Sequence, residues 1–270
     1  MTAKECYQAG RLKEAIEKTT EDIKADPADQ RARVFMFELL CFSGDLSRAQ
    51  KQLDAITASE VDAEIAVARY RNLLSAEVIR REVFSGRARP HIQEPVPDYA
   101  ASYVEAVKQV AEGNSENAIR LLEKAQESVP NQEALVNGEC CDGFGDGDDV
   151  LRPFLEATIE GAYCWVPWQS IRSLSLIPPK YLRDLFWMPA RLELENGRVG
   201  ETYLPVLYAG SHLSTDDQIR LGRVSEWRTD RPGLSLGIGQ RIFVAGDADR
   251  AMLDISELEF NHGDPGDSTR

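Results

Sequence analysis

The sequence predicts an α+β fold, in which a degenerate array of helical repeats comes first and a small β-rich domain, a curved or barrel-like sheet, follows. Three observations predict it. A Gly-x4-Ala pattern recurs in the first half, and the spacing of apolar residues changes near residue 136 from helical to alternating. All four tryptophans lie after that change.

The Gly-x4-Ala pattern marks a turn between two helices and the start of the second helix. Glycine tolerates the positive φ at which a helix ends, and a small alanine lets the paired helices approach closely. Pro27 and Pro130, each twelve residues after an alanine of the pattern, end the second helix. The first two glycines are 34 residues apart, which is the period of tetratricopeptide (TPR) repeats. The pattern occurs three times, at Gly10 and Ala15, at Gly44 and Ala49, and at Gly113 and Ala118.

One copy of the repeat is missing. The stretch from Glu60 to Ser85 predicts a single long helix instead, and Gly86 and a cluster of prolines follow it. The TPR-like array is therefore short and irregular. An ordinary helical bundle with coincident spacing stays open as the alternative.

The segment 31–42 has a clear helical pattern of apolar residues. In a repeat array such a face either stacks on the next repeat or lines a groove for a partner. Its apolar residues fall on one broad face, namely Val34, Phe35, Phe37, Leu40, Cys41 and Phe42.

The second half predicts short strands. The first two form a hairpin between Phe154 and Trp168, with Glu160 and Gly161 at the turn. Further strands are predicted over 171–177, 185–194, 202–208, 239–244 and 252–260, and a short helix over 216–220. Five prolines predict sheet edges and corners rather than long central strands: Pro167, Pro178, Pro179, Pro189 and Pro205.

These elements divide the chain into four parts. We expect a TPR-like helical domain over 1–135, an acidic glycine-rich linker over 136–152, a β-rich domain over 153–262 and a tail over 263–270. The linker contains four aspartates, but it lacks the ligand spacing of a calcium-binding EF-hand loop, so we expect no metal site.

Composition excludes several partner classes. The formal net charge is −14 over 270 residues, which disfavours binding to nucleic acids and to anionic membranes. No run of eighteen apolar residues occurs, and the first eight residues lack the apolar core of a signal peptide. We therefore expect a cytoplasmic protein. Five cysteines, an odd number, argue against a disulfide framework.

Catalytic patterns are missing from the sequence. No GxSxG, HExxH or P-loop pattern occurs, so we expect neither an enzyme nor a cofactor. One alternative stays open, an enzyme with an unrecognised site near Arg191, Trp227 and Arg241. A deep polar pocket with a strongly perturbed titratable group would support it.

Several motifs follow one another in order from about residue 7 to residue 260. They include Tyr163-Cys-Trp-Val-Pro-Trp168, Leu182-Arg-Asp-Leu-Phe-Trp-Met-Pro-Ala-Arg191, Leu204-Pro-Val-Leu-Tyr-Ala-Gly-Ser211 and Gly239-Gln-Arg241. In this order they resemble the ImpE family (also called SciE or TagJ), accessory components of bacterial type VI secretion. The linker departs from the family pattern at Cys140-Cys141 and in its extra glycines.

The resemblance implies a non-catalytic cytoplasmic protein that binds the N-terminal helical segment of the small subunit of the contractile sheath. It also implies an indirect partner, the AAA+ ATPase that recycles the contracted sheath.

A groove between helical repeats suits an amphipathic helix, because apolar anchors at i, i+3 and i+4 fit between the repeats. We expect the sheath helix on the repeat half, with Phe35, Phe37, Leu40 and Phe42 as candidate anchors. An acidic rim would favour basic residues in the ligand. The alternative is that these side chains stack one repeat on the next.

A second hypothesis places the partner on the β-rich domain, because aromatic residues dominate contact surfaces as well as cores. Its candidate contact residues are Trp187, Arg191, Trp227 and Arg241. The protein would then be a general adaptor or scaffold whose repeats support the β-rich domain.

Overall fold

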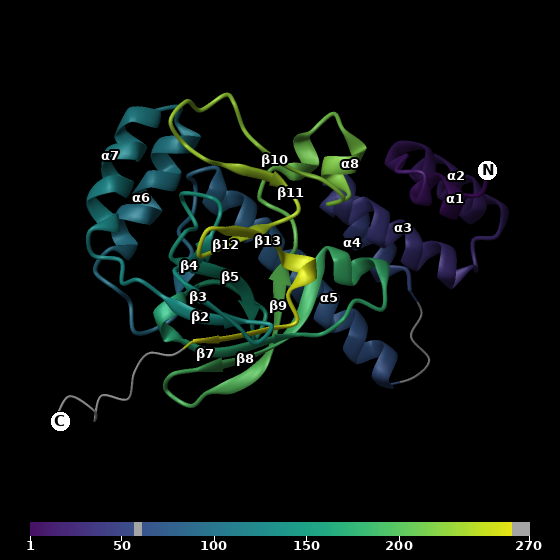
Figure 1. Cartoon of the computed structure of the whole chain (residues 1–270). Helices are drawn as coiled ribbons and strands as arrows, with labels where there is room; N and C mark the ends of the chain where they lie inside the picture. Colours follow the sequence, from purple (N-terminus) through teal and green to yellow (C-terminus); the bar gives the residue numbers. More distant parts are fainter. Residues whose placement is uncertain (57–60, 261–270) are drawn as a thin grey trace.

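The structure, a computed structural model, describes residues 1–56 and 61–260. Helices dominate the part before residue 130 and strands the part after it, so the predicted α+β class is confirmed (Figure 1). The predicted tail over 263–270 lies outside the described residues, as does the end of the predicted β-rich domain at 261–262.

The first four helices form two helix–turn–helix pairs, which contact each other through α2 and α3. Gly10 and Gly44 sit at the turns with φ of 73° and 82°, and Ala15 and Ala49 are fully buried between the helices. The predicted roles of these glycines and alanines are confirmed. The pairs are α1 (Ala3–Gln8) with α2 (Leu12–Ala25), and α3 (Gln30–Ser43) with α4 (Leu46–Asp54).

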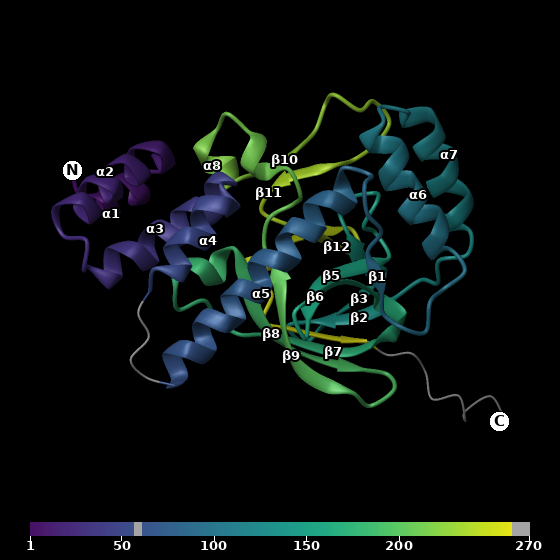
Figure 2. The ribbon, with the colours of Figure 1, turned by 180° about the vertical axis from the view of Figure 1, so that it is seen from behind.

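A long helix separates these pairs from the third pair. Figure 2 shows α5 (Val61–Phe84) lying across the sheet, with α1–α4 at one end of the molecule and α6 (Ala100–Ala111) and α7 (Ser115–Gln126) at the other. Gly113 has φ of 82° at the α6–α7 turn. The predicted long helix and the irregular array are therefore confirmed.

The turn glycines allow a matched test of backbone strain. A Cβ at Gly44 would lie 2.4 Å from Cδ2 of His212, whereas a Cβ at Gly113 would meet nothing within 4 Å. Both have φ of 82°, so Gly113→Ala should lower the free energy of unfolding by about 1–2 kcal/mol. Gly44→Ala should cost more, because His212 must also move. Urea denaturation of both variants checks this, and equal losses would contradict the predicted contact with His212.

The main sheet has nine strands in the order β1-β6-β5-β9-β8-β7-β14-β2-β3. The pairings are antiparallel except between β1 and β6. Glu160 and Gly161 both have positive φ at the β5–β6 turn, so the predicted hairpin is confirmed. The strands are β1 (His91–Ile92), β2 (Glu133–Val136), β3 (Glu139–Asp142), β5 (Phe154–Ile159), β6 (Ala162–Pro167), β7 (Ile171–Leu176), β8 (Trp187–Leu194), β9 (Val199–Pro205) and β14 (Glu257–Phe260).

The predicted linker over 136–152 is wrong. Its residues form β3 and β4 (Phe144–Asp146), and β4 belongs to a second sheet with β12 (Ile242–Ala245) and β13 (Ala248–Ala251). The chain bends at Gly143, where φ is 90°. Gly145 is required because a Cβ there would lie 2.7 Å from the backbone oxygen of Arg152. The glycines thus allow tight strand packing instead of a loose connection.

Pro189 is a second correction, because it lies inside the eight-residue strand β8, between β7 and β9. It pairs with Tyr203 of β9, and its carbonyl accepts a hydrogen bond from the amide of Ile177, one residue beyond the end of β7. Proline has no N–H to donate, and at Pro189 this matters little because the neighbouring strand β7 has already ended.

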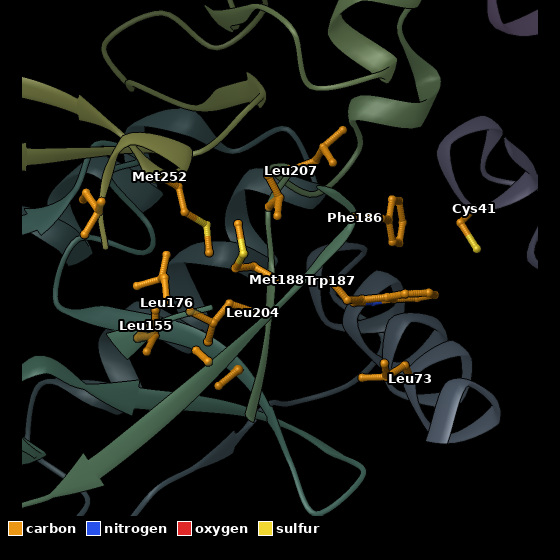
Figure 3. Packing of buried hydrophobic residues seen from close by; sticks show 14 of the residues in the cluster. Cys41, Leu73, Leu155, Leu176, Phe186, Trp187, Met188, Leu204, Leu207 and Met252 are labelled. Atoms are coloured by element: carbon orange, nitrogen blue, oxygen red, sulfur yellow. The ribbon is translucent and has the colours of Figure 1, made fainter. Parts of the chain in front are cut away.

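The largest hydrophobic core joins the helical and β-rich parts. Figure 3 shows Met188 and Leu204 inside the curved sheet, while Phe186 and Trp187 point to the helices that carry Cys41 and Leu73. The 3-10 helix η2 (Leu182–Leu185) precedes β8 and contacts α3. The segment η2–β8 is therefore the junction between the two parts.

Candidate functional site

The predicted anchors on α3 lie inside this junction. Phe37, Leu40 and Phe42 are 2%, 0% and 1% exposed. The ring of Phe37 stacks on Trp187 with centroids 6.4 Å apart, and Phe42 meets Phe186 edge-on at 5.2 Å. The chain's own η2–β8 segment therefore covers this face of α3. In this structure the three side chains have no surface left for a partner.

Phe35 has a different neighbour. It is half-buried, and its ring meets Tyr7 of α1 edge-on with centroids 6.2 Å apart. Phe35 therefore packs one helix pair on the other, as the alternative to a partner contact predicts.

An ion pair closes the junction on its polar side. Arg183 donates a hydrogen bond of 2.8 Å to Glu38, and its guanidinium lies over the rings of Tyr70 and Tyr181. Burial raises the pKa of Glu38, and Arg183 opposes that shift. The contact between α3 and η2 is therefore both apolar and electrostatic.

The four candidates in the β-rich part do not form one site. Trp187 is buried in the junction, and Arg191 is exposed on β8 opposite Glu201. Arg241 is 1% exposed, whereas Trp227 is 41% exposed and packs on Tyr208 with ring centroids 6.1 Å apart. The predicted alternative of an enzyme site around Arg191, Trp227 and Arg241 therefore has no geometric support.

Arg241 belongs to a buried charge network. Its guanidinium donates hydrogen bonds to Asp146 of β4 and Glu156 of β5. Arg80 of α5 donates to both oxygens of Glu156, at 2.7 Å and 3.0 Å, and to the carbonyl of Leu207 at 2.8 Å. Each of these four charged side chains is at most 5% exposed. The network therefore ties α5 to the sheet.

The charges in this network are matched. Burial alone would raise the pKa of Glu156, but Arg80 and Arg241 hold it at about 2. The hydroxyl of Tyr163 also donates to Glu156. This carboxylate therefore stays ionised and fully hydrogen-bonded, which suits a structural clamp and not a general base.

A cavity of about 360 Å³ lies beside the network. It is bounded by the end of α5, by α6, and by the loops around residues 209–213 and 228–237. The apolar wall includes Phe84, Val107, Val110, Leu151, Leu236 and, 77% exposed, Leu213. The polar wall includes Arg81, Arg87, His212 and Arg228, with Asp148 and Tyr208 among the buried lining residues. Sequence reasoning missed this cavity.

Asp148 is held by the backbone. Its two oxygens accept hydrogen bonds from the amides of Val150 at 3.0 Å and Gly237 at 2.9 Å. Burial and the charge of Asp146 raise its pKa to about 8. The pKa of His212 falls to about 4 because of burial and the charges of three arginines, Arg81, Arg80 and Arg220. At neutral pH the charged groups among the lining residues are therefore arginines, and Arg81, Arg87 and Arg228 pair with Glu77, Glu82 and Asp230 outside the lining.

Stability should fall as the pH rises from about 6.5 to 8. Folded Asp148 keeps its proton up to about pH 8, whereas the unfolded chain releases it near the ordinary value of 3.8. In this range the folded state therefore binds one proton more than the unfolded state. Unfolding releases that proton, so a rise in pH favours unfolding. His212 acts in the opposite sense, but only between about pH 4 and 6.5. Urea midpoints at several pH values should show a flatter slope for Asp148→Asn, and an unchanged slope would contradict the assignment.

Two further properties hold for residues 1–56 and 61–260. No group of three or more His, Cys, Asp or Glu side chains is arranged to hold a metal ion. In the same ranges, no helix has the length and apolar character needed to cross a membrane.

Comparisons with known proteins agree with this architecture. Residues 7–76 match the tetratricopeptide repeat family, which confirms the TPR-like prediction, and residues 138–259 match the ImpE protein family. The type VI secretion system accessory component TagJ of Pseudomonas aeruginosa is 36% identical over 264 residues, which cover 98% of this chain and 92% of that protein. The crystal structure of protein VPA1032 from Vibrio parahaemolyticus has the same fold, with a TM-score of 0.88 and 25% identity over 96% of this chain and 97% of that one.

Proposed function

The chain belongs to the ImpE family, and on that premise we propose that it is a non-catalytic accessory protein of a bacterial type VI secretion system. It binds the N-terminal helical segment of the small subunit of the contractile sheath in the cytoplasm. Through this contact it influences recycling of the contracted sheath by the AAA+ ATPase. The observation that carries the proposal is the similarity to TagJ over nearly the whole length of both chains.

The carboxyl groups of the interior support a non-catalytic role. Glu156 is fully hydrogen-bonded, and both oxygens of Asp148 accept backbone amides. A general base needs a free oxygen within reach of a substrate proton. The cavity therefore suits binding better than catalysis.

The closed junction favours a partner surface away from the inner face of α3. The chain's own η2–β8 segment covers Phe37 and Phe42, and Leu40 on the same helix is fully buried. This observation favours the second candidate function, an adaptor whose β-rich part takes part in partner binding.

Co-elution in size-exclusion chromatography tests the proposal. The purified chain should form a complex with the small sheath subunit from the same secretion gene cluster. It should form none with a subunit that lacks the N-terminal helix. Equal binding of both subunits would place the contact elsewhere on the partner, and binding of neither would overturn the proposal.

A further inference from the structure

The cavity beside Asp148 has a charge that differs from that of the chain as a whole. The chain carries a net charge of −14, yet Arg81, Arg87 and Arg228 line this cavity. Its lining carboxyl, Asp148, is held by two backbone amides and keeps its proton at neutral pH. Burial lowers the pKa of His212, and the charges of Arg81, Arg80 and Arg220 lower it further.

The three guanidinium groups can each donate a hydrogen bond to a further carboxylate. In the described part of the chain, Arg87 binds Glu82 through Nε and Nη2, and Arg228 binds Asp230 through the same two atoms. Arg81 uses Nε and Nη1, for Glu77 and for the carbonyl of Gly44. Each therefore keeps one terminal nitrogen for a ligand, and Arg87 exposes 66% of its side chain.

Leu213 projects from a fixed support. It ends the 3-10 helix η3 (Ser211–Leu213), and Gly210 before it has φ of 86°. The hydroxyl of Ser211 donates to the carbonyl of Tyr208 at 2.6 Å and accepts the amide of Gly239 at 2.8 Å. Leu213 is thus held in place, and it is 77% exposed beside an apolar wall. Burial of its side chain against an apolar partner surface would be favourable.

We propose that this cavity is the docking site for one partner, an amphipathic helix that carries an acidic residue beside its apolar anchor. The anchor inserts against Leu213 and Phe84, and the carboxylate binds the arginines Arg81, Arg87 and Arg228. This inference rests on the proposed function, and its occupant is the helical segment of the small sheath subunit. A volume of about 360 Å³ admits side chains, so the helix itself lies across the mouth.

The proposal reverses the charge expected from the sequence. An acidic rim favouring a basic ligand was predicted for the repeat groove, whereas this cavity selects an acidic ligand by charge complementarity. The site also lies at the C-terminal end of α5, where Arg81 donates a hydrogen bond to the carbonyl of Gly44 at the α3–α4 turn.

Fluorescence anisotropy tests the site with the full-length chain and a labelled peptide of the N-terminal helix of the small sheath subunit. Leu213→Asp should weaken binding by about tenfold or more, since it places a charge in the apolar contact. Arg87→Glu should weaken it by about fivefold or more at low salt, and by less at high salt because the charges are screened.

Matched controls come from the β8–β9 hairpin. Val199 is 47% exposed and the side chain of Arg198 is 57% exposed, so Val199→Asp and Arg198→Glu make the same changes away from the cavity. Both should bind within about twofold of wild type. Circular dichroism of every variant should match wild type, because all four substituted side chains are exposed.

The outcomes separate this inference from the proposed function. If the wild-type chain binds neither the peptide nor the intact subunit, the proposed function fails. If wild type binds but Leu213→Asp and Arg87→Glu bind equally well, the cavity is not the site, although the function stands. If Leu213→Asp changes the oligomeric state in sedimentation and leaves peptide binding unchanged, a second copy of the chain covers the cavity and the inference is overturned. Recovery of Arg87→Glu binding by a peptide with lysine in place of its acidic residue would support the inference.

Discussion

Replacing Arg241 by methionine should destabilise the protein by about 3–5 kcal/mol, because it leaves buried carboxylates without their counter-charge. Asp146 is 0% exposed and loses the guanidinium that pairs with it. Glu156 keeps Arg80 but loses its second cation. Chemical denaturation monitored by tryptophan fluorescence measures the loss.

Arg250→Met is the matched control. Arg250 pairs with Glu139 at 2.9 Å, but the two side chains are 44% and 75% exposed, so the loss should stay below about 1 kcal/mol. Adding Asp146→Asn to Arg241→Met should recover part of the stability, since it removes one unpaired charge. Similar effects of Arg241→Met and Arg250→Met would contradict the proposed importance of the buried network.

Replacing Trp187 by alanine should cost about 3–5 kcal/mol and open the junction between α3 and the sheet. Its ring contacts Phe37, Tyr70 and Phe186, and it is 2% exposed. Denaturation measures the stability, and limited proteolysis measures the opening as faster cleavage within α3–α5.

Trp227→Ala removes the same side chain at a surface position. Trp227 is 41% exposed and packs on Tyr208, so its loss should cost about 1 kcal/mol and leave the proteolysis pattern unchanged. A Trp187→Ala variant that is as stable as Trp227→Ala would show that the junction does not hold the two parts together.

Local chemistry explains which parts of the fold were predicted. Gly10, Gly44 and Gly113 have positive φ, and the alanine five residues after each glycine is buried. Each of these features depends on a few neighbouring residues, so one sequence suffices to find it. The β5–β6 hairpin was found for the same reason.

The wrong linker shows where local reasoning stops. Glycines and aspartates are typical of loops, but β3 pairs with β2 across a two-residue turn at Asn137 and Gly138, and β4 pairs with the distant strand β12. Asp146 is buried because Arg241, 95 residues later, pairs with it. The composition of a segment shows that its residue types disfavour a strand, but it does not show which other residues of the chain stabilise that strand.

The candidate anchors failed for a related reason. The apolar face of α3 was predicted correctly, but the pattern does not show what covers that face. The apolar pattern of α3 would be the same whether a partner helix or the chain's own Trp187 covers this face. The cavity was missed because its arginines come from the end of α5, from the turn after it and from a loop more than a hundred residues away. One signal was available: Glu156 lies within the otherwise uncharged strand β5.

Hydrogen exchange of the full-length chain, with and without the sheath-helix peptide, tests the central claim most directly. We expect the peptide to slow exchange in residues 81–87 and 208–213 and to leave α3 and residues 182–188 unchanged. Slower exchange confined to α3, or faster exchange in residues 182–188 as the helix displaces the chain's own segment, would contradict the account.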